Sequence, residues 1–157
     1  MPVVRGKQIS ILFSREDIAN RNLELAEQIG QFGPQNRDEG REILRWMLFD
    51  NHKFTSNIAT YRFMAVLAKV GDPAVHEFLK GRMMQALKVV ERRLAQNEFL
   101  LGDRMTIADF SLLGYLYYPD EFHMTGWPDF PNIKRWTEQV QGMKGWVGPY
   151  ELMPQKA

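Results

Sequence analysis

Apolar residues recur at helical spacing through most of this chain, and this periodicity limits its fold more than any other feature. Between about residues 38 and 70 the recurring side chains, three, four or seven positions apart, are Ile43, Met47, Phe54, Ile58, Tyr61, Ala65 and Ala68. A second series runs from Val75 to Leu94. Because this spacing places apolar side chains on one face of an α-helix, we predict a mainly helical bundle.

Glycine and proline residues mark the ends of the predicted helices. Residues 71–73, Gly-Asp-Pro, separate the first two helices, which are predicted to pack in antiparallel fashion. Two further helices are predicted over residues 106–117 and 131–141. The polar residues 50–53 interrupt the first apolar series, so the long helix either bends there or turns a solvated face outward. Residues 145–157 are rich in turn formers and are predicted to run extended along the surface.

The beginning of the chain has a different pattern. Residues 2–13 contain two short apolar runs joined by a turn, which predicts a β-hairpin. Ser14 follows, with an acidic residue three positions later, as is typical of a helix start. Because a lone hairpin is marginally stable in water, it must pack on something else. The glycines and proline of residues 30–34 divide the chain into residues 1–32 and residues 33–157.

Composition excludes several kinds of function. The chain carries 20 basic and 19 acidic side chains, a net charge of +1, which favours neither nucleic acid nor an anionic membrane as a partner. It has no cysteine, and its histidines, His52, His76 and His123, are far apart, so we expect no metal site. No apolar run approaches the roughly 18 residues of a membrane span. The N-terminus lacks the pattern of a secretory leader, and we therefore expect a cytoplasmic protein.

Thr106 and Asp109 form the clearest local motif. A Thr and an Asp three residues apart at the start of an apolar run predict a capping box, in which each side chain satisfies a backbone amide of the other residue. Loss of either partner is expected to cost about 0.5–2 kcal/mol. We interpret both residues as structural.

The surroundings of this box resemble a known family. The stretch FLLGDRMTIADF over residues 99–110, the FPNIKRW stretch over residues 130–136 and the RWMLFDNHKF stretch over residues 45–54 resemble the C-terminal all-helical domain of glutathione S-transferases in order and spacing. The resemblance covers roughly residues 37–153. Residues 2–29 resemble the second half of the thioredoxin-like domain that precedes this domain in the family.

The resemblance implies a glutathione site near the start of the chain. Pro2 stands where the family has a cis-proline beside the cysteinyl backbone of glutathione, and Ser14 stands where a serine binds the γ-glutamyl carboxylate. A carboxylate at a helix N-terminus is favoured by free amides and by the helix dipole. Ser14 can equally serve only as an N-cap, and Phe13 replaces the acidic or amide partner that the family places before it.

The resemblance also implies an electrophile pocket for a small hydrophobic molecule, with Phe54, Tyr61 and Tyr115 as candidate lining residues, although aromatic residues at helical spacing are more often core. It implies a homodimer, and the helix over residues 38–70 would meet the partner subunit. The expected function is therefore conjugation or binding of glutathione with a hydrophobic electrophile.

Two alternatives stay open. The family's thiol-activating Tyr, Ser or Cys belongs to a strand–helix–strand segment that would precede residue 1, so we expect this chain to contain no catalytic residue of that kind. The chain is then either a non-catalytic dimerising or ligand-binding module, or a fragment of a normal enzyme.

Overall fold

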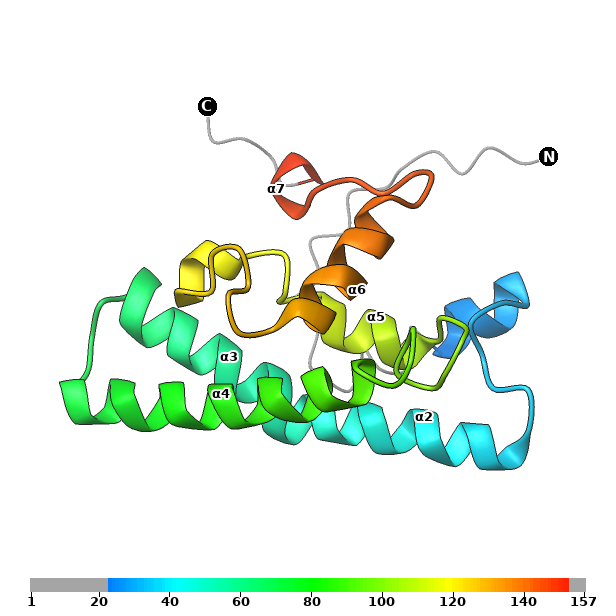
Figure 1. Ribbon diagram of the computed structural model, residues 1–157, viewed down its shortest axis with the longest axis horizontal. Coiled ribbons are helices and arrows are strands. Elements are labelled where there is room, and N and C mark those ends of the chain that lie inside the picture. The colour runs from blue at the N-terminus through cyan, green and yellow to red at the C-terminus, as the bar shows by residue number, and fades with distance from the viewer. Residues whose placement is uncertain (1–22, 153–157) are drawn as a thin grey trace.

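The computed structural model describes residues 23–152, and over this range the chain is helical with no strand (Figure 1). The mainly helical prediction is therefore confirmed. The hairpin predicted for residues 2–13 lies outside the described residues, as do Pro2 and Ser14. Residues 23–29 form a helical segment that precedes the bundle. None of the helices in residues 23–152 combines the length and the hydropathy of a membrane span.

A long helical run opens the bundle, as predicted, but it is not one regular α-helix. It consists of α2 (Arg37–Phe49), the π-helical segment η1 (Asp50–Phe54), α3 (Thr55–Tyr61) and a second π-helical segment, η2 (Arg62–Leu67). The first π-helical segment coincides with the polar interruption at residues 50–53. A π turn accommodates an extra residue and rotates the helix faces that follow it, which explains the break in the apolar series.

The second helix, α4 (Pro73–Leu94), returns alongside α3 in the opposite direction (Figure 1). The turn between them requires Gly71, whose φ of 106° is unfavourable for residues with a Cβ atom. Asp72 then caps α4 by accepting the Ala74 amide at 2.7 Å, and Pro73 occupies the first helical turn. The predicted antiparallel pair is therefore present.

The remaining helices are α5 (Ile107–Leu113), the 3-10 segment η3 (Pro119–Phe122), α6 (Pro131–Gln141) and α7 (Pro149–Leu152). The prediction of a third helix reaching residue 117 was wrong, because α5 stops at Leu113 and a tight turn follows, in which the Leu116 amide bonds to the Leu113 carbonyl at 2.9 Å. Gly114 is a poor helix former and Pro119 cannot continue a helix. The tail predicted as extended also contains α7.

The helix α6 begins on a carboxylate from another helix. Glu91 of α4 accepts the Asn132 amide at 3.0 Å and the Ile133 amide at 2.9 Å, one with each oxygen. These amides are among those that a helix start leaves without an intrahelical partner. An anion there also meets the positive end of the helix dipole. Glu91 therefore fixes α6 against α4.

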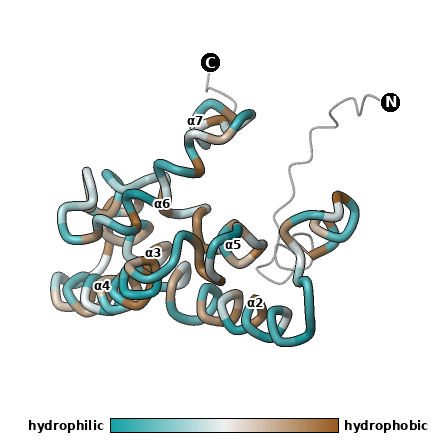
Figure 2. The backbone as a smooth tube through the Cα atoms, turned by 45° about the vertical axis from the view of Figure 1, so that its right-hand side comes forward, coloured by the Kyte–Doolittle hydropathy of each residue, from teal (hydrophilic) through white to brown (hydrophobic). Residues whose placement is uncertain are grey.

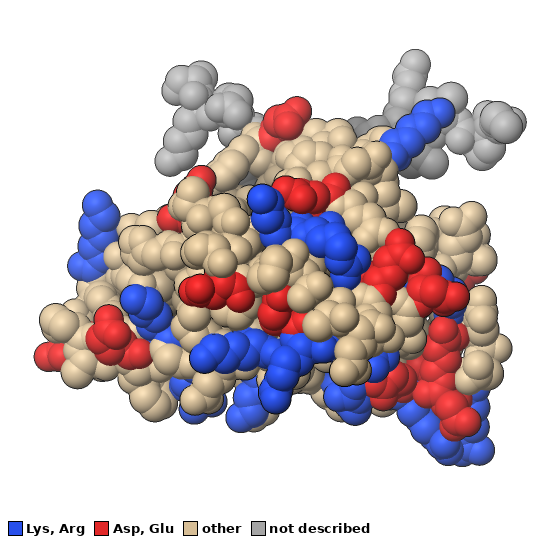
Figure 3. Space-filling model, in the orientation of Figure 1, with Lys and Arg blue, Asp and Glu red and all other residues tan. Residues whose placement is uncertain are grey.

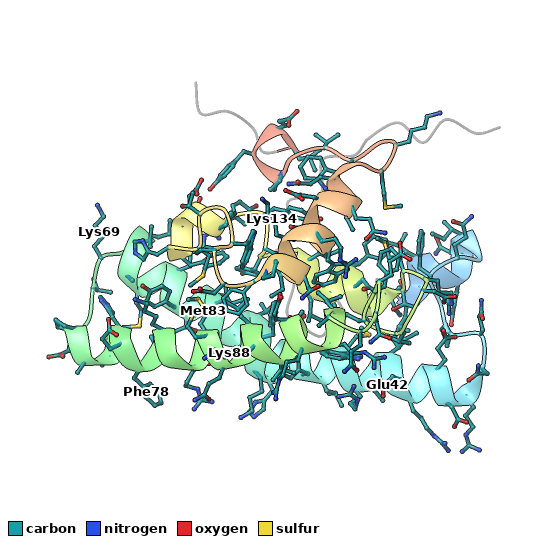
Figure 4. The ribbon with its side chains drawn as sticks, in the orientation of Figure 1. Glu42, Lys69, Phe78, Met83, Lys88 and Lys134 are labelled. Atoms are coloured by element: carbon teal, nitrogen blue, oxygen red, sulfur yellow. The ribbon has the colours of Figure 1, made fainter. Side chains whose placement is uncertain are left out.

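The hydrophobic core lies between α4 and the other helices. Along α2 and α4 hydrophilic and hydrophobic residues alternate at helical spacing (Figure 2), and Met83 of α4 points into the interior (Figure 4). The largest side chains with almost no exposed surface are Trp136, Phe54, Phe122, Phe130, Ile58, Met83, Leu87, Leu94, Leu100, Leu112, Leu116 and Ile133. Burial of each such side chain contributes about 1.5–3 kcal/mol, so the bundle has a substantial core.

Candidate functional site

Thr106 and Asp109 form a buried capping box at the start of α5, and neither has exposed surface. The Thr106 amide donates to Asp109 Oδ2 at 2.8 Å, and the Thr106 hydroxyl donates to the same oxygen at 3.1 Å. Asp109 Oδ1 accepts the Leu100 amide at 2.9 Å, a contact that the sequence pattern did not reveal. Burial raises the pKa of the Asp109 carboxyl, and the hydrogen bonds from Leu100 and Thr106 oppose this shift. All of these contacts are internal to the protein.

The loop before α5 is tied to the segment that enters the bundle. Arg104 donates to the Gly33 carbonyl at 2.9 Å and pairs with Glu39 at 2.5 Å. The Ile107 amide donates to the Phe32 carbonyl at 3.0 Å. These bonds fix residues 32–33 to the start of α5, so the start of α5 also positions the entry to the bundle.

A polar boundary lies where the long helical run meets α5 and η3, and we call it the seam. Its members are Asp50, Thr55, Arg62, Ser111, Tyr115, Tyr118 and Glu121. Both π-helical segments begin with a charged seam residue, Asp50 in η1 and Arg62 in η2. π-helical segments inside α-helices are frequently found at functional sites. The π-helical segments therefore mark the seam as a candidate ligand site of the bundle.

At one end of the seam a carboxylate bridges two helices. Asp50 is 5% exposed and accepts hydrogen bonds from the Thr55 hydroxyl at 2.5 Å and the Ser111 hydroxyl at 2.6 Å. A buried carboxylate needs such donors because desolvation of an ionised group is costly. The contact from Ser111 joins the first π turn to α5.

At the other end of the seam an arginine lies between a carboxylate and an aromatic ring. Arg62 forms an ion pair with Glu121, and its guanidinium lies 4.4 Å from the centre of the Tyr118 ring. Burial raises the pKa of Tyr118, Arg62 opposes this shift, and Glu121 and Tyr115 add to it. The two tyrosines therefore lie close enough to influence each other electrostatically.

The C-terminal segment packs beside this end of the seam. The Tyr150 ring lies edge-on to Tyr118 at 5.1 Å, and the Trp146 ring contacts Tyr117 at 5.4 Å. Burial raises the pKa of Tyr117 to about 12. The seam thus ends in an aromatic wall made by residues from two parts of the sequence, 117–118 and 146–150.

The three predicted pocket residues fall in different places. Phe54 is completely buried, with its ring 6.1 Å from that of Phe49, and Tyr61 is 5% exposed with its ring 6.3 Å from His123. Tyr115 is partly exposed and belongs to the seam. Phe54 and Tyr61 therefore support the wall from within, whereas Tyr115 can meet a ligand directly.

Sequence reasoning missed six of the seven seam residues, all of which carry charge or hydroxyl groups: Asp50, Thr55, Arg62, Ser111, Tyr118 and Glu121. Asp50 was noticed only as part of a polar interruption. The signal that was available was the break in helical spacing itself, because a π turn rotates polar residues toward a neighbouring helix. No pattern in the sequence pairs Arg62 with Glu121, which lies 59 positions later.

Nothing in residues 23–152 resembles a metal site, since no three His, Cys, Asp or Glu side chains gather there. The seam offers instead a partly exposed phenol, a guanidinium and aromatic faces. Such groups bind and orient a planar organic molecule through stacking and hydrogen bonds.

Comparison with known proteins finds relatives of this chain. The family described as glutathione S-transferase, C-terminal domain, matches residues 54–142. Glutathione S-transferase F11 of Arabidopsis thaliana is 33% identical over 122 residues, which cover 73% of this chain and 56% of that protein. FtsZ-localized protein A of Caulobacter vibrioides is 30% identical over 109 residues, which cover 66% of this chain and 46% of that protein.

A solved structure shares the fold. The crystal structure of a glutathione transferase from Burkholderia graminis, with two glutathione molecules bound per subunit, matches with a TM-score of 0.71 at 22% identity. The match covers 85% of this chain and 57% of that one. The chain thus spans about half the length of each of these three proteins.

Proposed function

Because the chain belongs to the glutathione S-transferase family, we propose that it provides the helical half of a glutathione-dependent protein and binds a hydrophobic electrophile along the seam. The observation that carries this proposal is the family match over residues 54–142, which includes every seam residue except Asp50 and most of the core. The glutathione bound in the structural relative from Burkholderia graminis supports the same class of co-substrate.

In this proposal the seam is the wall against which the electrophile lies. Tyr115 is partly exposed, whereas the Tyr118 ring is buried and held between Arg62 and Tyr150. Tyr115 is therefore the residue assigned to direct contact with the ligand, and Tyr118 keeps the wall rigid, which lowers the conformational cost of binding. Phe54 and Tyr61 act indirectly, by filling the space behind the wall.

The glutathione contacts belong to residues 1–32 in this proposal. Pro2 would adjoin the cysteinyl backbone and Ser14 would bind the γ-glutamyl carboxylate, as the resemblance implies. Lowering of the thiol pKa, which a hydrogen bond to the thiolate achieves, is assigned to the first half of the thioredoxin-like domain. The chain described here would then position both partners of the reaction without activating the thiol.

The proposal is tested by titrating the purified chain with glutathione in a calorimeter and by assaying conjugation to a chlorodinitrobenzene. We expect binding at millimolar glutathione that is lost in Ser14→Ala and retained in Tyr115→Phe, because the proposal assigns a contact with the tripeptide to Ser14 and none to Tyr115. Absence of binding to the unaltered chain, or equal binding by Ser14→Ala, would contradict the proposed glutathione site.

The electrophile wall has its own test. In any form of the protein that conjugates glutathione to the electrophile, we expect Tyr115→Phe to raise KM for the electrophile by about 3–10-fold. Loss of one hydrogen bond to a bound ligand has an effect of this size. The KM for glutathione should not change. Thr60→Ala, an exposed threonine on the long helical run, is the matched control.

The second candidate function is a non-catalytic module that dimerises or binds a ligand. A relative named for its localisation with FtsZ, at 30% identity, favours it. The calorimetric titration distinguishes the two candidate functions, because a module without glutathione chemistry would fold normally and yet bind no glutathione. The homodimer that the resemblance implies is a prediction common to both, and light scattering of the purified chain tests it.

A further inference from the structure

The second π-helical segment, η2, is apolar and yet lies at the surface. After Arg62 its residues are Phe63, Met64, Ala65, Val66 and Leu67, and none of the six is buried. Phe63 is 58% exposed and Leu67 is 56% exposed. A helix that is apolar all round is normally buried, and adjoining exposed apolar side chains are typical of an interaction site. The surface of η2 therefore suits an apolar occupant.

The hydrogen bonds of η2 determine which of its side chains share a face. The Ala68 amide donates to the Phe63 carbonyl, five residues earlier, at 2.8 Å. In this geometry side chains four and five positions apart lie on the same side of the segment. Arg62 is therefore followed, one turn later, by Val66 and Leu67. We call Val66 and Leu67 the η2 face.

Other sides of η2 face the protein. Ala65 packs against the hydrophobic core, and the Met64 side chain lies against Gly71 in the turn before α4. Val66 is partly exposed, and Leu67 is exposed. The η2 face is therefore accessible to a ligand.

The η2 face continues the seam. Arg62 is both a seam residue and the first residue of η2, and its guanidinium is held by Glu121 and by the Tyr118 ring. The segment η3, which carries Glu121, packs beside η2 (Figure 1). A ligand bound at this end of the seam therefore meets the η2 face on the far side of Arg62.

The surroundings of the η2 face carry little charge. Glu121 neutralises Arg62, and the next charged residue along the chain is Lys69. Figure 4 places Lys69 at the outer end of the long helical run, and in Figure 3 the surface between that end and η3 is mostly uncharged. Neither an anion nor a cation is therefore favoured here.

The shape and chemistry of the η2 face favour an aliphatic chain. Val66 and Leu67 present only methyl and methylene groups, which attract apolar groups without fixing their orientation. Leu67 is five positions beyond Arg62, a distance on the order of 7 Å along a helix. A flexible alkyl chain can extend over that distance from the seam, whereas a compact aromatic group bound at the seam leaves Leu67 uncovered.

We propose that the seam and the η2 face together select electrophiles that carry a long alkyl chain. The reactive end of the electrophile lies near Tyr115, and the chain lies over Val66 and Leu67. This inference rests on the proposed glutathione-dependent function and specifies the substrate class of the same site. The two residues of the η2 face contribute apolar contact and take no part in bond making.

The test compares the binding of S-methyl-, S-hexyl- and S-decylglutathione by calorimetry. These ligands share the tripeptide and differ only in the length of the alkyl chain. Full burial of one methylene strengthens binding about fourfold, so a chain with one side in water gains about twofold per methylene. We expect the dissociation constant to fall about tenfold from S-hexyl- to S-decylglutathione.

Replacing the η2 face should remove this gain alone. We expect the double variant Val66→Ser with Leu67→Ser to bind S-methylglutathione like the unaltered chain, and to gain less than about threefold from hexyl to decyl. Its circular dichroism should stay native, because neither residue is buried. The matched control is Leu44→Ser on α2, where Leu44 is 55% exposed, and it should keep the full gain.

The possible results separate this proposal from the proposed function. Binding of S-methylglutathione with no gain for longer chains, a full gain in the double variant, or an equal loss in Leu44→Ser would overturn the role of the η2 face and leave the glutathione function standing. Binding of none of the three ligands by a natively folded chain would overturn both. A change of oligomeric state in the double variant, measured by light scattering, would show that a second copy covers the η2 face instead.

Discussion

Asp109 combines complete burial with three hydrogen bonds, from the amides of Thr106 and Leu100 and from the Thr106 hydroxyl. We predict that Asp109→Ala lowers the free energy of unfolding by about 1–3 kcal/mol, because both amides lose a buried acceptor. Urea unfolding followed by circular dichroism measures the change. The control Asp103→Ala, at an exposed position of the same loop, should stay within about 0.5 kcal/mol of the unaltered chain.

The Asp109 carboxyl should also make the unfolding free energy depend on pH. Because burial raises its pKa above the ordinary 3.8, the folded chain holds this proton more tightly than the unfolded chain. The stability that Asp109 contributes must therefore fall as pH rises from about 4 toward neutrality. We predict that the difference in unfolding free energy between the unaltered chain and Asp109→Asn decreases over that range. A difference that is flat or that grows with pH would contradict the raised pKa.

At the level of single residues, the contacts of the candidate site were predictable from the sequence only where the partners are close together in the chain. The Thr106 and Asp109 pair was predictable because a capping box is a local pattern, with partners three residues apart. Arg62 with Glu121 and Asp50 with Ser111 were not, since each pair joins residues about 60 positions apart. Phe54 and Tyr115 are both aromatic and helix-compatible, and only the packed structure separates the buried ring from the partly exposed one.

Among the elements, α6 owes its start to a carboxylate on α4. We predict that Glu91→Gln destabilises the chain by about 1 kcal/mol, because the amide side chain keeps only one of the two acceptor oxygens and loses the charge at the N-terminus of α6. Thermal unfolding of Glu138→Gln, which removes an exposed carboxylate from α6 itself, provides the control. Equal melting temperatures for the two variants would contradict the capping role of Glu91.

The elements were more predictable than the contacts between them. Apolar spacing and the Gly-Asp-Pro turn were enough to predict the long helical run and α4, because both depend on local sequence. Apolar spacing could not predict the two π-helical segments, because a π turn is stabilised by tertiary contacts such as that of Asp50 with Ser111. The early end of α5 depends on Gly114 and on the approach to Pro119, whose effects on helix length the apolar pattern concealed.

At the scale of the molecule, the seam joins the long helical run to α5 and presents hydroxyl and aromatic groups. Membership of the glutathione S-transferase family is the basis of the substrate class proposed for this surface. The chain spans about half the length of the relatives it matches.

We expect a hydrophobic group joined to glutathione to bind at the seam. NMR titration of the isotope-labelled chain with S-hexylglutathione, in which an alkyl chain replaces the electrophile, tests this most directly. We predict that the largest amide shift changes occur at Arg62, Tyr115 and Tyr118, while Lys88 and Val89 on α4, which are not seam residues, stay unchanged. Shift changes confined to residues outside the seam, or none at millimolar ligand, would contradict binding at the seam.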